Sequence, residues 1–279
     1  MSPEPEPGPA PDSSSPELLA ELEQTAVELA RLAGAEIVTA LGRTLAVRYK
    51  KDEAGALPMD PVSEVDHQVE VLIRARLGER FPDHEIIGEE IDLRPEGRHD
   101  FAWVVDPIDG TSNFVNGFPL FAGSIGVLYR GEPVAGAIWC STSHALRAGV
   151  YHAHRGGTLR FEDEPLEARG NPALRRRLAG EPGIPRTSDA PWDVRVTGSA
   201  AIECAFVAAG LLRVARFERP NVWDVGAGLA LVRAAGGAIR TLGPAGWEPL
   251  ERCENPRDWR QSLILGESEA VEILCRAHA

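Results

Sequence analysis

Apolar residues recur at helical spacing near the start of the chain. Ser15 followed by Pro16 is typical of a helix N-cap with proline at the first helical position. We expect this helix to run to about Leu41. The residues that recur along it are Leu18, Leu22, Val27, Ala30, Ala33 and Ile37. The pattern predicts a long amphipathic packing helix and assigns it no chemistry.

Helical and strand patterns alternate along the rest of the chain. The helices that we predict span residues 67–77, 200–211, 221–236 and 269–276. The predicted strands span residues 84–87, 101–105, 118–129, 133–139, 148–152, 159–161, 194–196, 212–217, 238–242 and 262–265. Arg130-Gly131-Glu132 is expected to form a hairpin turn. Such alternation suits layers of helices and sheets, so the expected fold class is α/β.

Residues 101–114 combine an apolar run with two aspartates on a tight turn. The run Phe101–Val105 predicts a short buried strand. Asp106 closes this strand, because the proline and the glycine that follow forbid a simple continuation of strand or helix. Asp109 lies three residues further along the same turn. Paired carboxylates are the ligands that hard divalent cations prefer.

A new helix is expected directly after this turn, capped by Thr111 or Ser112, with free N–H groups facing the turn. Helix N-termini bind phosphate, so the stretch predicts a metal-assisted phosphoryl site. The alternative on these residues alone is an ordinary solvated turn. An EF-hand is a poor match, because no Asp-x-Asp-x-Asp-Gly loop with a distal glutamate is present. A haloacid-dehalogenase-type nucleophile would need its two aspartates separated by one residue.

Further acidic residues lie near the ends of predicted elements. Asp66 and Asp224 each fall in or near the first turn of a helix, where a carboxylate also has the ordinary role of balancing the helix dipole. Glu89 and Glu90 follow Gly88 at a strand end, where two adjacent glutamates also suit a plain surface. Beside the downstream Asp-x-x-Asp, the glutamates become candidates for a further metal carboxylate, and Asp66 becomes a candidate for a catalytic role.

The composition limits the possible function classes. The chain has 279 residues, of which 43% are hydrophobic and 25% charged, as is ordinary for a globular protein. The formal net charge is −13 and no Lys/Arg-rich run is present, which disfavours nucleic-acid binding. An acidic protein repels a phosphorylated substrate at long range, so bound cations must reverse the sign locally. Metal dependence therefore fits the charge balance.

The cysteines and the termini indicate the compartment. The scattered cysteines lack any Cys-x-x-Cys spacing, which argues against a zinc cluster and a disulfide framework: they are Cys140, Cys204, Cys253 and Cys275. No stretch has the length of a membrane span, and the acidic, proline-rich start shows no signal peptide. We therefore expect a cytoplasmic protein without a membrane partner.

Three segments are expected along the chain. Residues 1–14 are rich in Pro, Glu, Ser and Gly and predict a disordered tail. Residues 15–145 are expected to form an N-terminal α+β metal-binding domain. Residues 146–279 are expected to form a C-terminal α/β domain that completes the active site.

Two ordered blocks resemble the signatures of the inositol monophosphatase family. Residues 105–114, Val-Asp-Pro-Ile-Asp-Gly-Thr-Ser-Asn-Phe, closely resemble the first signature, and residues 223–237 resemble the second. Gly88-Glu89-Glu90 and Asp66 fall where that family places its remaining acids. The order and approximate spacing match over residues 60–240. The resemblance implies a Mg²⁺-dependent phosphomonoesterase with an α-β-α-β-α sandwich, as in inositol monophosphatase and fructose-1,6-bisphosphatase.

The resemblance also implies roles for individual residues. The metal ligands that it implies are Glu89, Asp106, the carbonyl of Ile108, Asp109 and Asp224. Asp106 would be shared by two Mg²⁺ ions, and Glu89 would also support a third, weaker ion. The implied nucleophile is a metal-activated water oriented by Thr111, with Asp66 behind it. The catalytic set is thus Thr111, Asp66 and Glu89.

The implied substrate contacts come from several parts of the chain. They are Asp109, Gly110, Thr111, Ser112, Gly198, Ser199, Ala200, Glu218 and Asp224. The N–H groups of Gly110 and Thr111 would carry the phosphate. Glu218 lies one residue closer to Trp223-Asp224 than in the inositol-type pattern, and Pro220 interrupts the segment. Lys50 and Lys51 are both candidates for the lysine of a mobile loop, because that loop is lengthened here.

The expected reaction is hydrolysis of the phosphate monoester of a small polyol, with inositol-1-phosphate the leading case. Related enzymes act on 3′-phosphoadenosine 5′-phosphate, fructose-1,6-bisphosphate or histidinol phosphate. Thr111-Ser112-Asn113-Phe114 favours the inositol-like branch over the adenosine-type Thr-Lys-Glu-Phe. A fructose bisphosphate would need a second basic subsite, which the sequence does not place. A non-catalytic protein with this fold would lack a metal acid, and none is missing. Inhibition by Li⁺ and a homodimer follow from the family resemblance.

Overall fold

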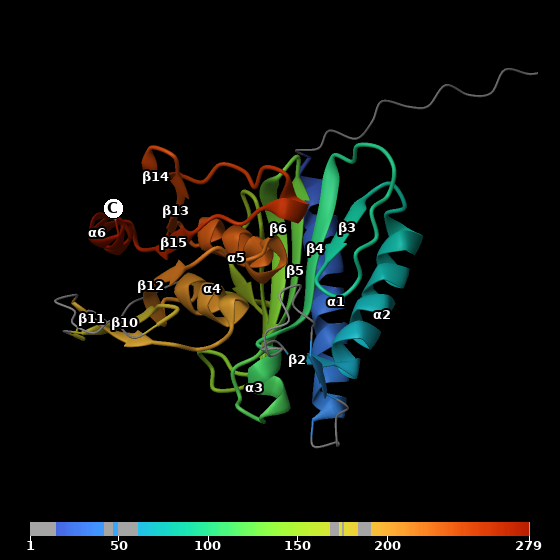
Figure 1. Ribbon diagram of the computed structural model, residues 1–279, viewed down its shortest axis with the longest axis horizontal. Coiled ribbons are helices and arrows are strands. Elements are labelled where there is room, and N and C mark those ends of the chain that lie inside the picture. The colour runs from blue at the N-terminus through green and yellow to red at the C-terminus, as the bar shows by residue number, and fades with distance from the viewer. Residues whose placement is uncertain are drawn as a thin grey trace, which may run out of the picture.

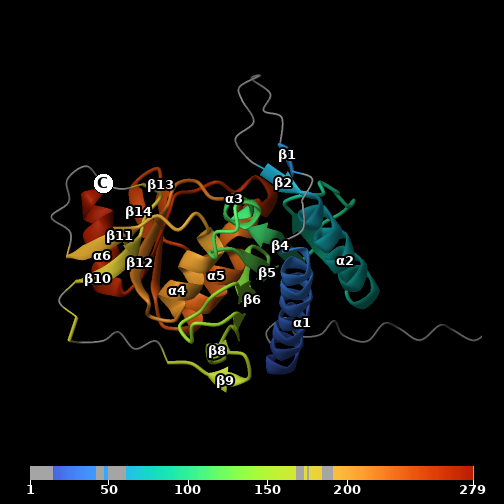
Figure 2. The ribbon, with the colours of Figure 1, turned by 90° about the horizontal axis from the view of Figure 1, so that it is seen from below.

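A computed structural model describes residues 15–41, 47–49, 61–167, 173–174, 176–183 and 191–278. Their helices and sheets stack in the order α-β-α-β-α (Figures 1 and 2). The layered α/β fold predicted from the sequence is confirmed. No helix in the described part of the chain is both long and apolar enough to cross a membrane.

The first layer consists of α1 (Pro16–Ala40) and α2 (Glu64–Arg80), which lie on one face of a seven-stranded sheet (Figure 1). Helix α1 begins as predicted, because Oγ of Ser15 accepts a hydrogen bond from the N–H of Leu18 at 3.1 Å. Its apolar face is fully buried against the sheet. Upstream of α2 lies a two-stranded ribbon of β1 (Val47–Tyr49) and β2 (Pro61–Ser63).

The seven-stranded sheet has the strand order β3-β4-β5-β6-β7-β8-β9. Its strands are β3 (Glu85–Gly88), β4 (Phe101–Asp109), β5 (Ala122–Tyr129), β6 (Glu132–Cys140), β7 (Gly149–His154), β8 (Arg160–Phe161) and β9 (Glu164–Pro165). Only the β3–β4 pair is parallel. The division between residues 145 and 146 falls between β6 and β7, which are paired neighbours in this sheet.

Strand β4 continues to Asp109, so the prediction that it ends at Asp106 is wrong. Asp106 pairs with Ser124 and Asp109 with Ala122, so one extra residue of β4 is accommodated between these pairs. Such a bulge tolerates Pro107, which has no N–H to donate to the ladder. The bulge changes the direction of β4 between Asp106 and Asp109.

The turn after β4 also differs from the prediction. Helix α3 (Thr111–Val115) has Gly110 as its N-cap, with a φ of 85°, and no side chain caps it. The predicted cap at Thr111 or Ser112 is therefore wrong. A left-handed backbone turn at a glycine replaces the side-chain cap, because glycine reaches positive φ without a steric penalty. The predicted hairpin turn between β5 and β6 is confirmed.

Helices α4 (Ala200–Ala208) and α5 (Val222–Ala234) form the middle layer between the two sheets (Figure 2). Two glycines of the first sheet allow α5 to approach closely. A Cβ at Gly126 would lie 2.6 Å from the backbone N of Ala227, and one at Gly136 would lie 2.7 Å from its Cα. This close contact fixes α5, and hence its N-terminus, against β5 and β6.

The second sheet has six strands in the order β11-β10-β12-β15-β13-β14. They are β10 (Arg177–Gly180), β11 (Trp192–Arg195), β12 (Leu212–Phe217), β13 (Ala238–Gly243), β14 (Gly246–Pro249) and β15 (Leu263–Gly266). Strand β14 was not predicted. A 3₁₀ turn (Pro256–Asp258) precedes β15, and α6 (Ser268–Ala277) covers the outer face as the last layer. All cysteines are buried free thiols.

Candidate functional site

Asp106 lies at the bulge of β4 with only 1% of its surface exposed. Its Oδ1 is buried and accepts no hydrogen bond. Burial raises the pKa of Asp106 well above its ordinary value, and the charges of Glu89, Asp109, Asp224 and Asp66 raise it further. Acids from four separate elements thus lie near enough to Asp106 for their charges to act on it.

Asp109 lies at the end of β4 and faces the beginning of α4. Its Oδ2 accepts a hydrogen bond from the hydroxyl of Ser199, the N-cap of α4, and another from the N–H of Ala201 at 2.7 Å. Burial raises the pKa of Asp109 to about 6, although these hydrogen bonds oppose the rise. The first sheet and the middle layer thus meet at this carboxylate.

Asp224 occupies the first turn of α5, as predicted. Its Oδ2 accepts hydrogen bonds from the backbone N of Asn221 at 2.7 Å and from Nδ2 of Asn221 at 3.1 Å. Burial, and then the charge of Asp109, raise the pKa of Asp224 to about 8. The ordinary helix-capping role of Asp224 is therefore confirmed, and its metal role stays a prediction.

Glu89 lies at the end of a strand of the first sheet, and Asp66 lies on a helix of the first layer. Glu89 follows β3, and its N–H donates to the carbonyl of Val105 at 3.2 Å, next to Asp106. Asp66 lies in the first turn of α2 with 1% of its surface exposed. Both residues therefore lie near enough to Asp106 for their charges to raise its pKa.

The chemistry of these donors fits a hard divalent cation. In the part of the chain that is described, no three His, Cys, Asp or Glu side chains converge closely enough, as they stand, to hold an ion. The gathered groups are nevertheless all carboxylates, which Mg²⁺ prefers. Oδ1 of Asp106 is buried without a hydrogen-bond partner. Burial is the main cause of the raised pKa values, and a cation would offset both that cost and the mutual repulsion of the acids.

The turn after β4 positions the remaining signature residues. Oγ1 of Thr111 donates to the carbonyl of Ile108 at 2.9 Å, so this hydroxyl touches the backbone oxygen that the resemblance names as a ligand. Gly110 supplies the left-handed turn. Ser112 is exposed, and its carbonyl accepts a hydrogen bond from Nδ2 of Asn116 at 2.8 Å.

A cavity of about 280 Å³ opens beside the acids. The predicted substrate contacts that line it are Gly198, Ser199, Ala200, Glu218 and Asp224. The other predicted substrate contacts do not line this cavity: they are Asp109, Gly110, Thr111 and Ser112. Lys50 and Lys51 lie outside the described residues.

Comparison with known proteins shows which family this chain belongs to. A model described as the inositol monophosphatase family matches residues 18–278. The chain belongs to the inositol monophosphatase family. The family resemblance and the enzyme class, a phosphoric monoester hydrolase, are thereby confirmed.

Similar members of the inositol monophosphatase family cover most of the chain. Inositol-1-monophosphatase ImpA of Mycolicibacterium smegmatis is 32% identical over 249 residues, which are 83% of this chain and 86% of that protein. A chloroplastic phosphatase of Arabidopsis thaliana is 31% identical over 234 residues, 77% of this chain but only 61% of the plant protein. The solved structure of extragenic suppressor protein suhB from Bartonella henselae matches with a TM-score of 0.72 and 25% identity, covering 94% and 98% of the two chains.

Several site residues of this inositol monophosphatase family member were not predicted. Arg216 lines the cavity between two acids, with an Nη1 to Glu218 distance of 2.7 Å and an Nε to Glu181 distance of 3.5 Å. Glu203 also lines the cavity and accepts a hydrogen bond from Oγ1 of Thr197 at 2.7 Å. Burial raises the pKa of Glu203 to about 7. The ion pair between Arg216 and Glu181 joins separate segments of the chain, so no local sequence pattern indicates it.

Asn113 belongs to the first family signature and was not predicted as a site residue. Its Nδ2 donates to the carbonyls of Leu120 at 2.6 Å and Thr197 at 2.8 Å. Asn113 therefore ties the turn after β4 to the loop before α4. Its place inside the signature was the available signal.

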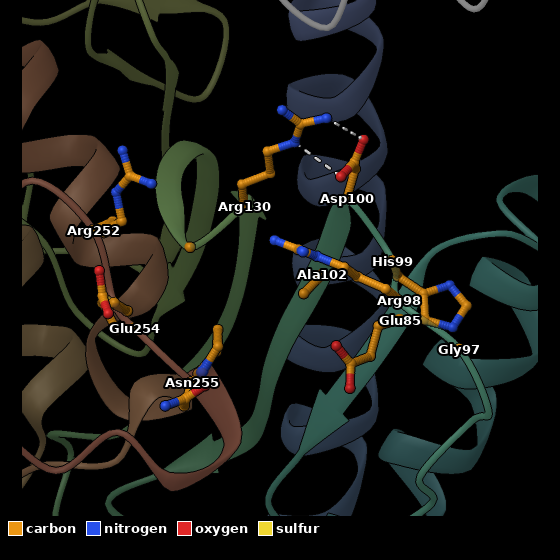
Figure 3. Close-up of a pocket in the computed structure, with 13 residues that line it drawn as sticks. Glu85, Gly97, Arg98, His99, Asp100, Ala102, Arg130, Arg252, Glu254 and Asn255 are labelled. Atoms are coloured by element: carbon orange, nitrogen blue, oxygen red, sulfur yellow. Dashed lines mark hydrogen bonds and ion pairs between the residues drawn. The ribbon is translucent and has the colours of Figure 1, made fainter.

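A second cavity, of about 570 Å³, lies where β4 begins (Figure 3). Ala102 and Asp100 line it, and Asp100 is held by two hydrogen bonds of 2.9 Å from Arg130 (Figure 3). None of the acids around Asp106 lines this cavity. It is therefore separate from the acids around Asp106.

Proposed function

We propose that this chain hydrolyses a small phosphate monoester with Mg²⁺ as cofactor, and that inositol 1-phosphate is the leading substrate. The observation that carries the proposal is the gathering of buried acids around Asp106, beside a cavity at the N-termini of α4 and α5. Relatives that carry the name inositol-1-monophosphatase support the substrate.

The acids have distinct places in this proposal. Those that would hold Mg²⁺ are Glu89, Asp106, the carbonyl of Ile108, Asp109 and Asp224. When bound, Mg²⁺ supplies charge neutralisation for the phosphoryl group and a lowered pKa for water. Phosphoryl transfer needs positioning and charge stabilisation more than a protein nucleophile. No serine or cysteine therefore has to attack the phosphorus.

Other residues position the reactants. Thr111 holds the carbonyl of Ile108 through its Oγ1 and, with Asp66 behind it, would orient the attacking water. The backbone N–H groups of Gly110 and Thr111 would hold the phosphate, with Ser112 beside them. Glu89 would assist in proton transfer as well as in metal binding.

The alcohol part of the substrate would occupy the 280 Å³ cavity. Its acids, among them Glu181 and Glu218, are acceptors for hydroxyl groups, and Arg216 adds a donor. Donors and acceptors side by side suit the vicinal hydroxyls of a polyol. Because both glutamates already balance the charge of Arg216, the cavity favours a neutral alcohol over a second phosphate.

Fructose-1,6-bisphosphate is the second candidate substrate. Two relatives, from Aquifex aeolicus and Thermotoga maritima, are named fructose-1,6-bisphosphatase/inositol-1-monophosphatase. Arg216 is the residue that would meet a second phosphate. A substrate comparison therefore has to include both compounds.

The test is phosphate release by the purified protein. The substrates are inositol 1-phosphate, fructose-1,6-bisphosphate, histidinol phosphate and 3′-phosphoadenosine 5′-phosphate, each with Mg²⁺ or with EDTA. We expect release that depends on Mg²⁺ and is fastest with inositol 1-phosphate. Release that is unaffected by EDTA, or absent for every substrate, would rule out the proposal.

Three finer expectations accompany this function. Millimolar Li⁺ should inhibit the Mg²⁺-dependent release, and an unchanged rate would indicate a different metal site. The homodimer and the cytoplasmic location expected from the sequence stay predictions. Sedimentation of the purified protein measures whether it is a homodimer.

A further inference from the structure

Glu70 is a buried carboxylate bound to the segment that carries Glu89. Its surface is 0% exposed. Its Oε2 accepts a hydrogen bond from the N–H of Glu90 at 2.7 Å, and its Oε1 accepts one from the N–H of Ile91 at 3.2 Å. Hydrogen bonds to an ionised acceptor are roughly twice as strong as neutral ones. The backbone directly after Glu89 is therefore tied to α2.

Arg74, one turn further along α2, completes this connection. Its Nε donates to Oε1 of Glu70 at 2.7 Å, and its Nη2 donates to the carbonyl of Ile91 at 2.6 Å. A longer bond of 3.4 Å joins Nη1 to the carbonyl of Ile86. The Glu70–Arg74 pair thus holds the segment 86–91 at both of its ends.

Gly88 provides an independent indication of the same contact. A Cβ built at Gly88 would lie 2.0 Å from Oε1 of Glu70. Gly88 does not have a positive φ, so its backbone conformation does not call for glycine. Position 88 is restricted by the space that a side chain would need. A side chain at position 88 would displace the carboxylate of Glu70, which is buried and hydrogen-bonded.

Helix α2 joins this contact to the rest of the site. Asp66 and Glu70 are four residues apart, so they lie on the same face of α2. The charge of Asp66 acts on Asp106, while Glu70 fixes the turn that carries Glu89. On its other side, that turn is bound to β4 through the N–H of Glu89 and the carbonyl of Val105.

We propose that Glu70 is a positioning residue that holds Glu89 in place for the divalent cation. This inference rests on the proposed function, in which Glu89 is a metal ligand. Partners that orient metal ligands affect metal affinity when they are removed, typically by about 10- to 100-fold. The hydrogen bonds of the Glu70 carboxylate go to Arg74 and to the backbone of Glu90 and Ile91, and it is not among the proposed metal ligands.

The test measures Mg²⁺ affinity directly, by calorimetric titration of the full-length protein without substrate. We expect Glu70→Ala and Gly88→Ala each to weaken binding at least about tenfold. Glu70→Gln should lie between wild type and Glu70→Ala, because the amide oxygen still accepts one of the two N–H bonds. Gly88→Ala keeps both Glu70 and Arg74, so the test remains decisive if Glu70→Ala does not fold.

The double variant Glu70→Ala/Gly88→Ala tests the contact itself. Once the carboxylate is gone, the new Cβ at position 88 has space, so the double variant should bind Mg²⁺ no more weakly than Glu70→Ala. Residues in contact show such non-additivity, whereas independent sites add. Additive losses of affinity would overturn the proposed coupling.

Glu23→Gln is the matched control. Glu23 is also buried, with 8% of its surface exposed, but it lies on α1 and its carboxylate contacts His152 and His154 of β7. The variant should lower the melting temperature and leave the Kd for Mg²⁺ unchanged. If Glu70→Ala and Gly88→Ala both bind Mg²⁺ with the wild-type Kd, the inference about Glu70 is wrong and the proposed function still stands. A wild-type protein that fails to bind Mg²⁺ would overturn the proposed function as well.

Discussion

The backbone N–H of Ala201 lies 2.7 Å from Oδ2 of Asp109 and donates a hydrogen bond to it across a sequence separation of 92 residues. Ser199 donates its hydroxyl to the same oxygen. The end of β4 is thereby joined to the first turn of α4, where N–H groups and the helix dipole favour a negative charge. One oxygen of a candidate metal ligand is fixed before any cation arrives.

Ser199→Ala should lower both stability and activity. The substitution removes a donor from Asp109, and it removes the N-cap of α4, where Oγ accepts from the N–H of Ile202 at 3.2 Å. Loss of an N-cap costs about 1 kcal/mol of stability. We expect Mg²⁺-dependent phosphate release to fall by roughly tenfold, because the ligand loses its orienting bond. Thermal unfolding and steady-state kinetics measure the two effects.

Ser15→Ala separates these effects, because Ser15 caps α1 in the same way and has no contact with the site. Its Oγ accepts from the N–H of Leu18 at 3.1 Å. This variant should lose about 1 kcal/mol of stability and keep the wild-type turnover. Equal losses of turnover in both variants would show that Ser199 matters only as a cap.

The layers of this fold were predictable because helical and strand periodicities are local properties of the chain. The continuation of β4 to Asp109 was not predictable from the sequence. Pro107 has no N–H to donate and is tolerated in the strand only because a bulge lies there. The cap at Gly110 was missed for a related reason. A backbone turn at positive φ leaves no side-chain signature beyond the glycine itself.

The candidate site likewise contains some residues that the sequence predicted and others that it did not. The acids around Asp106 were predicted from ordered motifs that each occupy a short stretch. Glu70 and Arg216 were not, because their roles depend on contacts with segments about 20 or 35 residues away. Burial and hydrogen-bond partners of this kind become visible only when the elements are placed in space.

Asp106→Asn should nearly abolish phosphate release while the protein stays folded. The substitution removes the charge that the proposal shares between two ions. In EDTA the variant should be more stable than wild type, because burial and four neighbouring acids disfavour the charged form of Asp106 and hold its pKa high. Activity assays and thermal unfolding in EDTA test both statements. Near-normal turnover would refute the bridging role.

The stability of the metal-free protein should fall as the pH rises. The pKa of Asp109 is raised to about 6 and that of Asp224 to about 8, both from 3.8. The folded state therefore binds these protons more tightly than the unfolded state. The stabilisation is complete below the unfolded value and is lost as the pH passes through the folded values.

Mg²⁺ should oppose this loss, so its stabilising effect should be greatest near the upper end of that range, at about pH 8. The measurement is the melting temperature in EDTA and in Mg²⁺ from about pH 5 to 8. The lowered pKa of Glu23 places its titration below this window. A difference between EDTA and Mg²⁺ that does not grow with pH would contradict the coupling of these aspartates to the metal.

Glu218→Gln tests the alcohol subsite. Oε1 of Glu218 accepts a hydrogen bond from Nη1 of Arg216 at 2.7 Å, and both residues line the 280 Å³ cavity. If the carboxylate accepts from a substrate hydroxyl, its neutral replacement should raise the KM for inositol 1-phosphate about tenfold. The Mg²⁺ dependence should stay unchanged, because Glu218 is not among the acids around Asp106.

The same substitution distinguishes the two candidate substrates. With only Glu181 left as a charged partner, Arg216 has a stronger attraction for an anion, so activity toward fructose-1,6-bisphosphate should rise relative to inositol 1-phosphate. Glu272→Gln provides the control, because Glu272 forms a comparable pair with Arg240 at 2.9 Å on the outer layer and does not line the cavity. An unchanged ratio in Glu218→Gln would show that Arg216 does not face the substrate.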